Sequence, residues 1–275
     1  MTSPSPTRIA ATFSALKSDG HLAFMPFVTA GDPGMDATQS LIRELGSQGV
    51  DLIEVGFPYS DPIADGPVIQ ASYTRALNAG LHVDEIFRGV SELPTDELPP
   101  LVAMVSYALL FRRGVDAFVK QAVDAGFAGF IIPDLPADEA AEVGEIVRVH
   151  GADLVQLIAP TTPNDRAKKI LAAASGFVYC ISIAGVTGVR DELPPELTEQ
   201  LRWLRSQTEL PLAVGFGISR PDQVDMLRDV ADGVIVGSAI VKHLADVTGS
   251  DDLASALSTV GRFAESMVAA TRAHG

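Results

Sequence analysis

Asp51-Leu52-Ile53-Glu54-Val55-Gly56 is a short apolar run with a carboxylate inside it, and the loop that follows, residues 57–67, is rich in proline, glycine and aspartate. The run has the length and composition of a buried strand, whereas the loop composition excludes both helix and sheet. A carboxylate in an apolar strand costs free energy to desolvate unless it has a partner or a chemical role. The sequence therefore predicts a strand that ends in a functional loop.

Seven further runs of this kind occur along the chain, and amphipathic helical patterns lie between them. The eight predicted strands are residues 23–29, 51–56, 101–106, 128–132, 154–159, 177–182, 212–215 and 233–237. Most are apolar throughout, which is typical of parallel strands covered by helices. One helical pattern runs from Val115 to Val123, and another places Val224, Leu227 and Ala231 on one face after Ser219-Arg220-Pro221. Alternating strands and helices indicate βαβ units.

Eight βα units in 275 residues fit a closed (β/α)8 TIM barrel. The alternative is a doubly wound open sheet, but no G-x-G-x-x-G motif follows the first strand. Extra helices are predicted at residues 7–18, before the first strand and placed to cover the barrel bottom, at residues 67–78 after the second strand, and directly after Gly237-Ser238 at the eighth. We expect one barrel domain over residues 1–275, with residues 1–6 as a flexible N-terminus.

Composition limits the partners and the compartment. The formal net charge of −15 and the sequence pI of about 4.6 argue against binding to nucleic acid or an anionic membrane. We find no apolar run of membrane-spanning length and no signal-peptide pattern at the start, so we expect a soluble, cytoplasmic protein. Five scattered histidines and a single cysteine, Cys180, indicate neither a metal site nor an internal disulfide, and Cys180 is expected to be a small buried residue.

The active sites of such barrels form where the strands run into their following loops. The second strand contributes Glu54, and its loop contributes Asp65. Two carboxylates in different environments suit proton transfer at neutral pH, although a structural glutamate and a turn-forming aspartate are the alternative. Further polar or small residues at such junctions are Ser106, Tyr107, Asp134, Tyr179 and the loop 184–188.

The last junctions are rich in glycine, which lets backbone N–H groups approach a ligand closely. The residues concerned are Gly188, Gly217, Gly237 and Ser238. Together they could hold a phosphate without arginine or lysine, in the position usual for these barrels, or they could simply turn strands into helices. Phe27 and Phe216 would face the same mouth and line a flat slot for an aromatic ring, with core packing as the alternative.

Taken together, the junction motifs resemble the tryptophan synthase alpha chain family, and the resemblance runs from about Phe13 to the last helix. The motifs are residues 26–33, 54–67, 133–136, 185–188, 215–218 and 233–239. The segment from Glu54 to Asp65 is highly specific, whereas the glycine-rich strand ends occur in other phosphate-binding barrels. Sugar-phosphate isomerases and epimerases, which need a different base or a metal, do not fit that segment.

The resemblance implies a cofactor-free lyase that cleaves indole-3-glycerol phosphate to indole and glyceraldehyde 3-phosphate in tryptophan biosynthesis. This retro-aldol reaction adds a proton to indole C3 and removes one from the side-chain hydroxyl. Glu54 matches the family's general acid/base, and Asp65 matches the carboxylate that binds the indole N–H. Thr187 matches the lid residue that orients this aspartate, and Tyr179 packs beside the glutamate. Gly188, Gly217, Gly237 and Ser238 match the phosphate site.

The resemblance also implies a partner, the pyridoxal-phosphate-dependent beta subunit, in an αββα heterotetramer. Pyridoxal phosphate would belong to that subunit. Pro58, Asp61 and Asp134 match positions that signal to or contact it. Three positions depart from the family pattern: Ser106-Tyr107-Ala108 replaces a frequent Tyr-x-Asn, and Ile183 replaces a frequent arginine. A free-standing lyase that releases indole, and a weakly active subunit that mainly activates a beta subunit, are therefore the alternatives.

Overall fold

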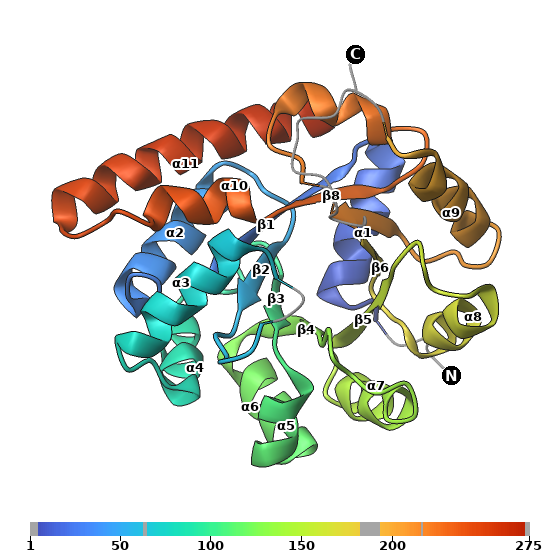
Figure 1. Ribbon diagram of the computed structural model, residues 1–275, viewed down its shortest axis with the longest axis horizontal. Helices are drawn as coiled ribbons and strands as arrows, with labels where there is room; N and C mark the ends of the chain where they lie inside the picture. The colour runs from blue at the N-terminus through green and yellow to red at the C-terminus, as the bar shows by residue number, and fades with distance from the viewer. Residues whose placement is uncertain (1–4, 63–64, 182–192, 216, 273–275) are drawn as a thin grey trace.

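The computed structural model, which describes residues 5–62, 65–181, 193–215 and 217–272, is a closed barrel of eight parallel strands inside a ring of helices (Figure 1). Each strand pairs with the next along the chain, and β8 pairs with β1. The strands are β1 (Ala23–Thr29), β2 (Ile53–Gly56), β3 (Leu101–Met104), β4 (Phe127–Ile131), β5 (Asp153–Ile158), β6 (Val178–Ile181), β7 (Leu212–Gly215) and β8 (Gly233–Val236). The predicted fold class is confirmed.

The strand boundaries lie close to the predicted ones. β1 and β7 have the predicted ends, and the other strands differ by one or two residues. β2 begins at Ile53 rather than at Asp51, and the Asp51 carboxylate contacts the backbone of β1. It accepts a hydrogen bond from the Phe24 backbone N–H at 2.8 Å and forms an ion pair with Arg272 at 3.1 Å.

The helices comprise an outer ring, the three predicted additions and one further helix, Tyr107–Arg113, that was not predicted. The ring consists of α2 (Met35–Ser47), α4 (Val83–Ser91), α6 (Val115–Ala125), α7 (Ala140–Val149), α8 (Asn164–Ala173), α9 (Pro195–Arg205) and α11 (Ser250–Thr271). The additional helices are α1 (Arg8–Asp19), α3 (Pro67–Asn78), α5 (Tyr107–Arg113) and α10 (Ser238–Val241), with a 3₁₀ turn η3 (Lys242–Leu244) after α10. Among the described residues, no helix is both long and apolar enough to cross a membrane.

The helix predicted after Pro221 is instead a pair of 3₁₀ turns, η1 (Pro221–Gln223) and η2 (Asp225–Leu227). The Gln223 side-chain oxygen accepts hydrogen bonds from the backbone N–H groups of Ser219 and Arg220, which ties the segment to the preceding loop. Val224 and Leu227 are still buried. Their spacing of three residues matches the period of a 3₁₀ helix as well as one face of an α-helix.

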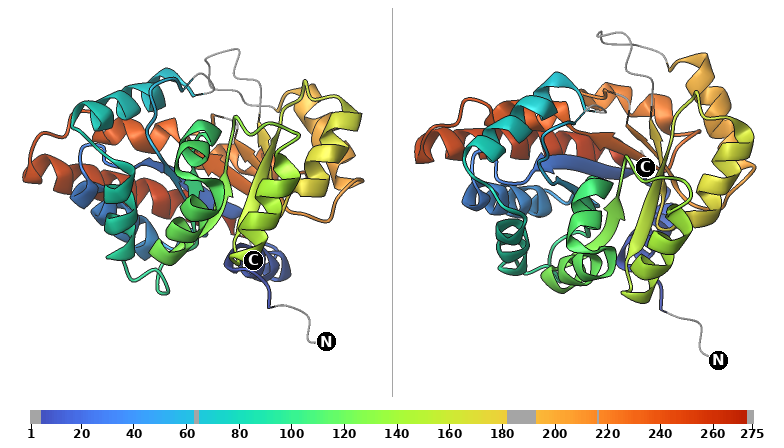
Figure 2. Two further views of the ribbon diagram at one scale, coloured as in Figure 1. Left: turned by 90° about the horizontal axis from the view of Figure 1, so that it is seen from below. Right: turned by 60° about the horizontal axis from the view of Figure 1, so that its bottom comes forward.

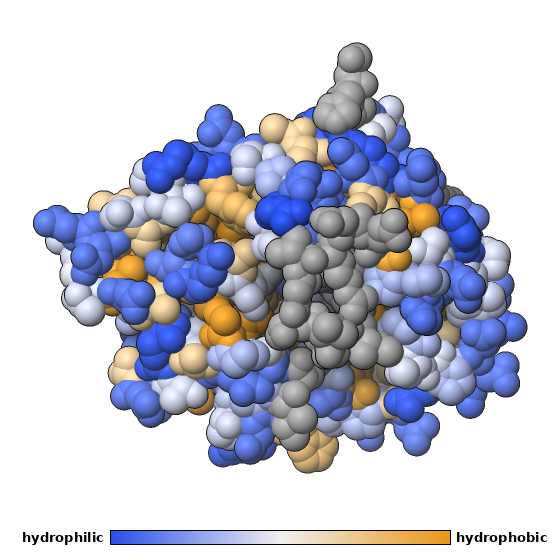
Figure 3. Space-filling view, turned by 45° about the horizontal axis from the view of Figure 1, so that its top comes forward, coloured by the Kyte–Doolittle hydropathy of each residue, from blue (hydrophilic) through white to orange (hydrophobic). Residues whose placement is uncertain are grey.

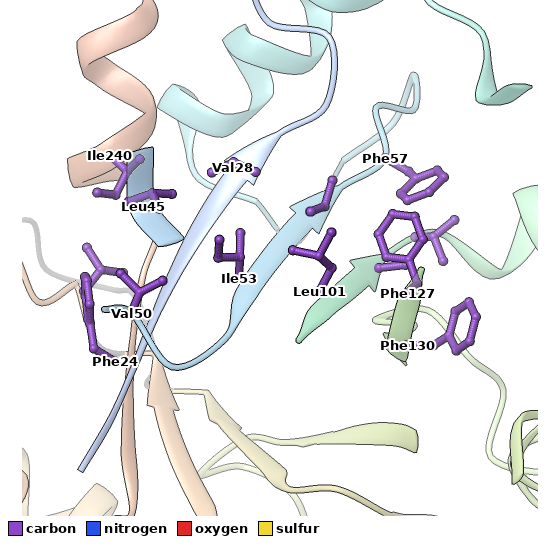
Figure 4. Packing of buried hydrophobic residues seen from close by; sticks show 14 of the residues in the cluster. Phe24, Val28, Leu45, Val50, Ile53, Phe57, Leu101, Phe127, Phe130 and Ile240 are labelled. Atoms are coloured by element: carbon purple, nitrogen blue, oxygen red, sulfur yellow. The ribbon is translucent and has the colours of Figure 1, made fainter. Parts of the chain in front are cut away.

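The core has two layers. Between the strands and the outer helices, side chains such as Val28, Ile53 and Leu101 on the strands pack with Leu45 and Ile240 on helices (Figure 4). Inside the barrel, a smaller cluster combines inward strand residues with the buried face of α1. On β2, Ile53 and Val55 belong to the outer layer, so the alternation of side chains along a strand turns Glu54 inward.

The predicted N-terminal helix does cover the barrel bottom, as Figure 2 shows α1 at the end opposite to α3. Ile9 is fully buried there, and the Phe13 ring lies 5.5 Å from the Phe177 ring. The Thr7 hydroxyl caps α1 and also donates a hydrogen bond to Asp153 at the start of β5. Because α1 fills this end, we expect an interior site to open at the opposite end, at the carboxyl ends of the strands.

Candidate active site

A cavity of about 460 Å³ opens at the carboxyl ends of the strands. Of the residues singled out from the sequence, it is lined by Phe27, Glu54, Asp65, Tyr179, Gly217, Gly237 and Ser238. Thr187, Gly188 and Phe216, together with the departure Ile183, lie outside the described residues. These seven residues come from strands β1, β2 and β6 and from the loops after β2, β7 and β8, and they meet in one cavity.

Glu54 lies on the cavity floor and is 1% exposed. It pairs with Phe27 of β1 and Val102 of β3, so apolar strands flank it on both sides. Within the described part of the chain, neither carboxyl oxygen has a hydrogen-bond partner. Burial, and secondly the negative charge of Asp65, raise the pKa of Glu54 to about 8. The carboxyl group is therefore mainly protonated at neutral pH, as a general acid must be.

Asp65 occupies a wetter position on the loop after β2 and is partly buried. Burial raises the pKa of Asp65 to about 6, so that it is mainly ionised at neutral pH. The loop is fixed to α3, because the Gln70 side-chain amide donates to the backbone carbonyls of Asp65 at 2.7 Å and Pro62 at 3.1 Å. The cavity therefore contains one neutral carboxyl group and one carboxylate. This arrangement allows the two groups to take different catalytic roles.

Tyr179 reaches the cavity from β6, and its position depends on Gly215 of the neighbouring strand β7. An ideal Cβ on Gly215 would lie 2.6 Å from the Tyr179 hydroxyl oxygen, so a side chain there would collide with the phenol. Burial, followed by the charges of Glu54 and Asp65, raises the pKa of Tyr179 well above its ordinary value. Tyr179 therefore stays neutral and can act only as a wall or a hydrogen-bonding group.

Phe27 forms the wall on the β1 side and is 2% exposed. An ideal Cβ on Gly56 would lie 2.3 Å from its ring, so glycine at this position admits the phenyl group. Met104, Ile235 and Ile69 add apolar surface to the same cavity. The sequence singled out none of these three, because buried aliphatic residues in a strand or helix carry no pattern that distinguishes a cavity wall from core.

The glycine-rich end of the cavity lies across β1 from the two carboxyl groups, on the loops after β7 and β8. Gly217 has a left-handed backbone with φ of +61°, and Gly237 directly precedes α10. Because α10 has only four residues, individual backbone N–H groups and the Ser238 hydroxyl, rather than a long helix dipole, are the donors available here. The wall also contains a cation that the sequence analysis missed, Lys242.

The residues matched to partner contacts lie apart from the cavity wall. Pro58 is buried, whereas Asp61 and Asp134 are exposed. The Asp134 carboxylate accepts a hydrogen bond from the Tyr107 backbone N–H at 2.6 Å, so it also holds the first turn of α5. Ser106, one of the departures, is 5% exposed and precedes that helix.

Two further expectations concern metal and thiol chemistry. Cys180 is buried as expected, and burial raises the pKa of its thiol to about 12, which keeps it from acting as a thiolate. In the described ranges, no group of three or more His, Cys, Asp or Glu side chains is arranged to hold a metal ion. The two carboxyl groups that line the cavity are those of Glu54 and Asp65.

Comparison with known proteins identifies the same family as the sequence motifs do, over nearly the whole chain. The family model for the tryptophan synthase alpha chain matches residues 13–272. The alpha chain of Rhodopirellula baltica is 46% identical over 270 residues, covering 95% of this chain and 97% of that one. The alpha chain of Picosynechococcus is 43% identical over 262 residues, covering 95% and 98%.

Solved structures agree with these relatives. The alpha subunit of Legionella pneumophila tryptophan synthase has a TM-score of 0.86 at 35% identity, with 97% of this chain and 99% of that one covered. A structure of Mycobacterium tuberculosis tryptophan synthase contains a chain with a TM-score of 0.87 at 31% identity, with 98% and 100% covered. The similarity thus extends to sequence and fold together.

Proposed function

Because this chain belongs to the tryptophan synthase alpha chain family, a family of carbon–carbon lyases, we propose that its cavity cleaves indole-3-glycerol phosphate, with Glu54 and Asp65 as the catalytic pair. This cleavage is the alpha reaction of tryptophan biosynthesis. The observation that carries the proposed residue roles is the buried Glu54 carboxyl, with no hydrogen-bond partner among the described residues and a pKa of about 8. A group held protonated in an apolar pocket is suited to protonate a carbon atom.

The reaction proceeds in two proton transfers. Glu54 donates its proton to indole C3, and the positive charge that develops on the ring nitrogen is stabilised by the Asp65 carboxylate, which accepts a hydrogen bond from the indole N–H. Glu54, now ionised, accepts the proton of the side-chain hydroxyl. The C–C bond breaks, its electron pair restores the aromatic indole, and the former carbinol becomes the aldehyde of glyceraldehyde 3-phosphate. Glu54 ends the cycle protonated again.

The rest of the cavity divides into a ring site and a phosphate site. Phe27 and Tyr179 provide flat surfaces for the indole in the cavity that Glu54 also lines. Gly217, Gly237 and Ser238 would bind the phosphate oxygens, with Gly188 completing the site and Thr187 orienting Asp65. Three of these assignments rest on the sequence alone: Thr187 on the family resemblance, Gly188 on the glycine pattern and the resemblance, and Phe216, as a further wall of the ring site, on its place after the seventh strand. The proposed domain organisation is one barrel over residues 1–275, and the proposed location is the cytoplasm.

We further propose that the chain works with a beta subunit in an αββα complex, and that it holds no cofactor itself, since pyridoxal phosphate belongs to the beta subunit. An exposed apolar residue beside the partner-matched positions supports this assembly. Phe111 on α5 is 69% exposed, and its ring lies 5.9 Å from that of Tyr107, whose N–H is bound by Asp134. The face of the molecule drawn in Figure 3 is mostly hydrophilic, with scattered apolar patches.

Indole release from indole-3-glycerol phosphate by the purified chain, with and without a cognate beta subunit, tests this function. Slow release that rises strongly when the beta subunit is added supports the coupled enzyme. Rapid release that the beta subunit leaves unchanged supports the free-standing lyase and would make Ser106 and Ala108 signs of lost coupling. The absence of indole under both conditions contradicts the proposal.

A further inference from the structure

We propose that Lys242 is a substrate-binding residue that pairs with the dianionic phosphate and makes the cavity selective for the phosphorylated substrate. The proposal rests on the function proposed above and adds a residue that the glycine-rich motifs do not include. Lys242 follows α10 directly and lines the same cavity as Gly217, Gly237 and Ser238. Among the described residues, no other lysine or arginine lines that cavity.

Helical geometry directs the lysine side chain toward the glycine-rich end. Lys242 lies four residues after Ser238 and keeps right-handed helical backbone angles, with φ of −58° and ψ of −28°. Residues i and i+4 of a helix share a face, and long side chains lean toward the N-terminus of the helix. The Lys242 stem is therefore expected to lean over the turn that begins with Ser238, in agreement with the place of Lys242 in the cavity lining.

The negative and positive charges of the cavity lie at opposite ends, as a substrate with a phosphate at one end requires. Glu54 and Asp65 belong to β2 and its loop, whereas Lys242 follows β8, and β1 lies between those strands. Two strand spacings correspond to about 10 Å. A ligand with its reacting carbon at the carboxyl groups and its phosphate at the lysine spans this separation with a three-carbon chain. The reverse orientation would place the phosphate against Asp65.

Lys242 is also available for a ligand. In the described part of the chain it has no ion-pair partner, unlike Lys120 on α6, which pairs with Asp124 at 2.6 Å. The protein carries a formal net charge of −15, so a phosphate approaching the cavity meets a repulsive field. A cation at the mouth lowers that repulsion locally and forms a charge-assisted hydrogen bond once the phosphate is bound.

Substitution by Lys242→Met retains the length and the apolar stem of the side chain but removes the charge. We expect the KM for indole-3-glycerol phosphate to rise about tenfold with little change in kcat, because the phosphate interaction is the same in the ground state and the transition state. The inhibition constant of inorganic phosphate should rise by a similar factor. Cleavage of unphosphorylated indole-3-glycerol should keep its kcat/KM. Lys242→Arg should restore most of the binding.

Lys120→Met is the matched control, since it removes another exposed lysine, on α6 and outside the cavity lining, and should leave all these values unchanged. If Lys242→Met binds substrate and phosphate as the wild type does, the proposal is wrong. An equal loss on both substrates would indicate a structural role and would also overturn it. If the wild type releases no indole, the proposed function fails, and calorimetric binding of inorganic phosphate to the wild type and Lys242→Met still decides the role of Lys242.

Discussion

At the scale of single residues, the sequence identifies the two acids but not their protonation states. Glu54 and Asp65 are visible as carboxylates on one strand and its loop. Their pKa values depend on burial by strands and helices that are distant in the sequence, and on the separation between the two groups. The values of about 8 and about 6 therefore follow only from the folded cavity.

These two pKa values predict a bell-shaped dependence of kcat/KM on pH. The reaction needs Asp65 ionised and Glu54 protonated, so activity should rise through an apparent pKa of about 6 and fall through one of about 8. Steady-state rates between pH 5 and pH 9.5 measure both limbs. In Asp65→Asn, the residual activity should lose the acid limb that Asp65 contributes. A rate that keeps rising above pH 8.5 would contradict the assignment of Glu54 as the initial acid.

The raised pKa of Glu54 also predicts how the stability depends on pH. From its ordinary pKa of 4.5 to about 8, the folded state binds this proton more tightly than the unfolded state, so the free energy of unfolding falls as pH rises through this range. Glu54→Gln removes this effect. Its stability relative to the wild type should improve by about 2–4 kcal/mol between pH 4.5 and pH 9. Urea denaturation of both proteins measures the difference, and a constant difference would contradict the prediction.

Lys242 shows why part of the site could not be predicted. In the sequence it is one charged residue after an apolar helical segment, which usually indicates a solvated surface. Its relation to the cavity depends on α10 starting at Ser238 and on the position of β8 in the barrel. The glycine-rich part of the phosphate site, in contrast, could be predicted from the sequence, because these glycines directly follow the predicted strands.

At the scale of secondary-structure elements, glycine positions on the strands decide how the cavity walls approach one another. Gly56 follows Glu54 on the inward face of β2, and its missing Cβ leaves space for both the Phe27 ring and the Tyr73 hydroxyl. The sequence shows the glycine but not what occupies the space. Strands were predictable because their apolar runs are distinctive, whereas the 3₁₀ turns after Pro221 were not, because the buried positions fit either helix type.

Gly56→Ala tests this clearance. An ideal Cβ would lie 2.3 Å from the Phe27 ring and 2.6 Å from the Tyr73 hydroxyl oxygen, both on fully enclosed side chains. We expect a loss of about 1–3 kcal/mol in the free energy of unfolding, together with a reduced kcat/KM. Gly34→Ala is the control, since nothing lies within 4 Å of its Cβ position. Equal stability of the two variants in denaturant titrations would refute the steric argument.

At the scale of the whole molecule, the two ends of the barrel have different roles, one in stability and the other in the chemistry. The bottom is closed by α1, and the carboxyl ends of the strands hold the cavity. Eight alternating units were enough to predict this arrangement from the sequence, because few topologies close eight parallel strands. The assembly with a beta subunit stays a prediction, since a single chain does not show which of its surfaces contacts a partner.

Ile9→Ala tests the separation of the two ends. Ile9 is fully buried in the bottom layer, so its truncation should cost about 2–4 kcal/mol in the free energy of unfolding. Lys17→Ala, on the exposed side of the same helix, should cost less than about 0.5 kcal/mol. Where the Ile9 variant is still folded, its kcat for indole release should equal that of the wild type. A large loss of kcat in folded Ile9→Ala would show that the two ends are coupled.

The central claim, that Glu54 transfers the protons of the cleavage, is tested most directly by single-turnover indole release in Glu54→Gln at saturating indole-3-glycerol phosphate. The amide keeps the size of the carboxyl group but cannot donate a proton to carbon. The account predicts a rate at least about 10²-fold below that of the wild type, with substrate still bound and the circular dichroism spectrum unchanged. A rate near that of the wild type would contradict it.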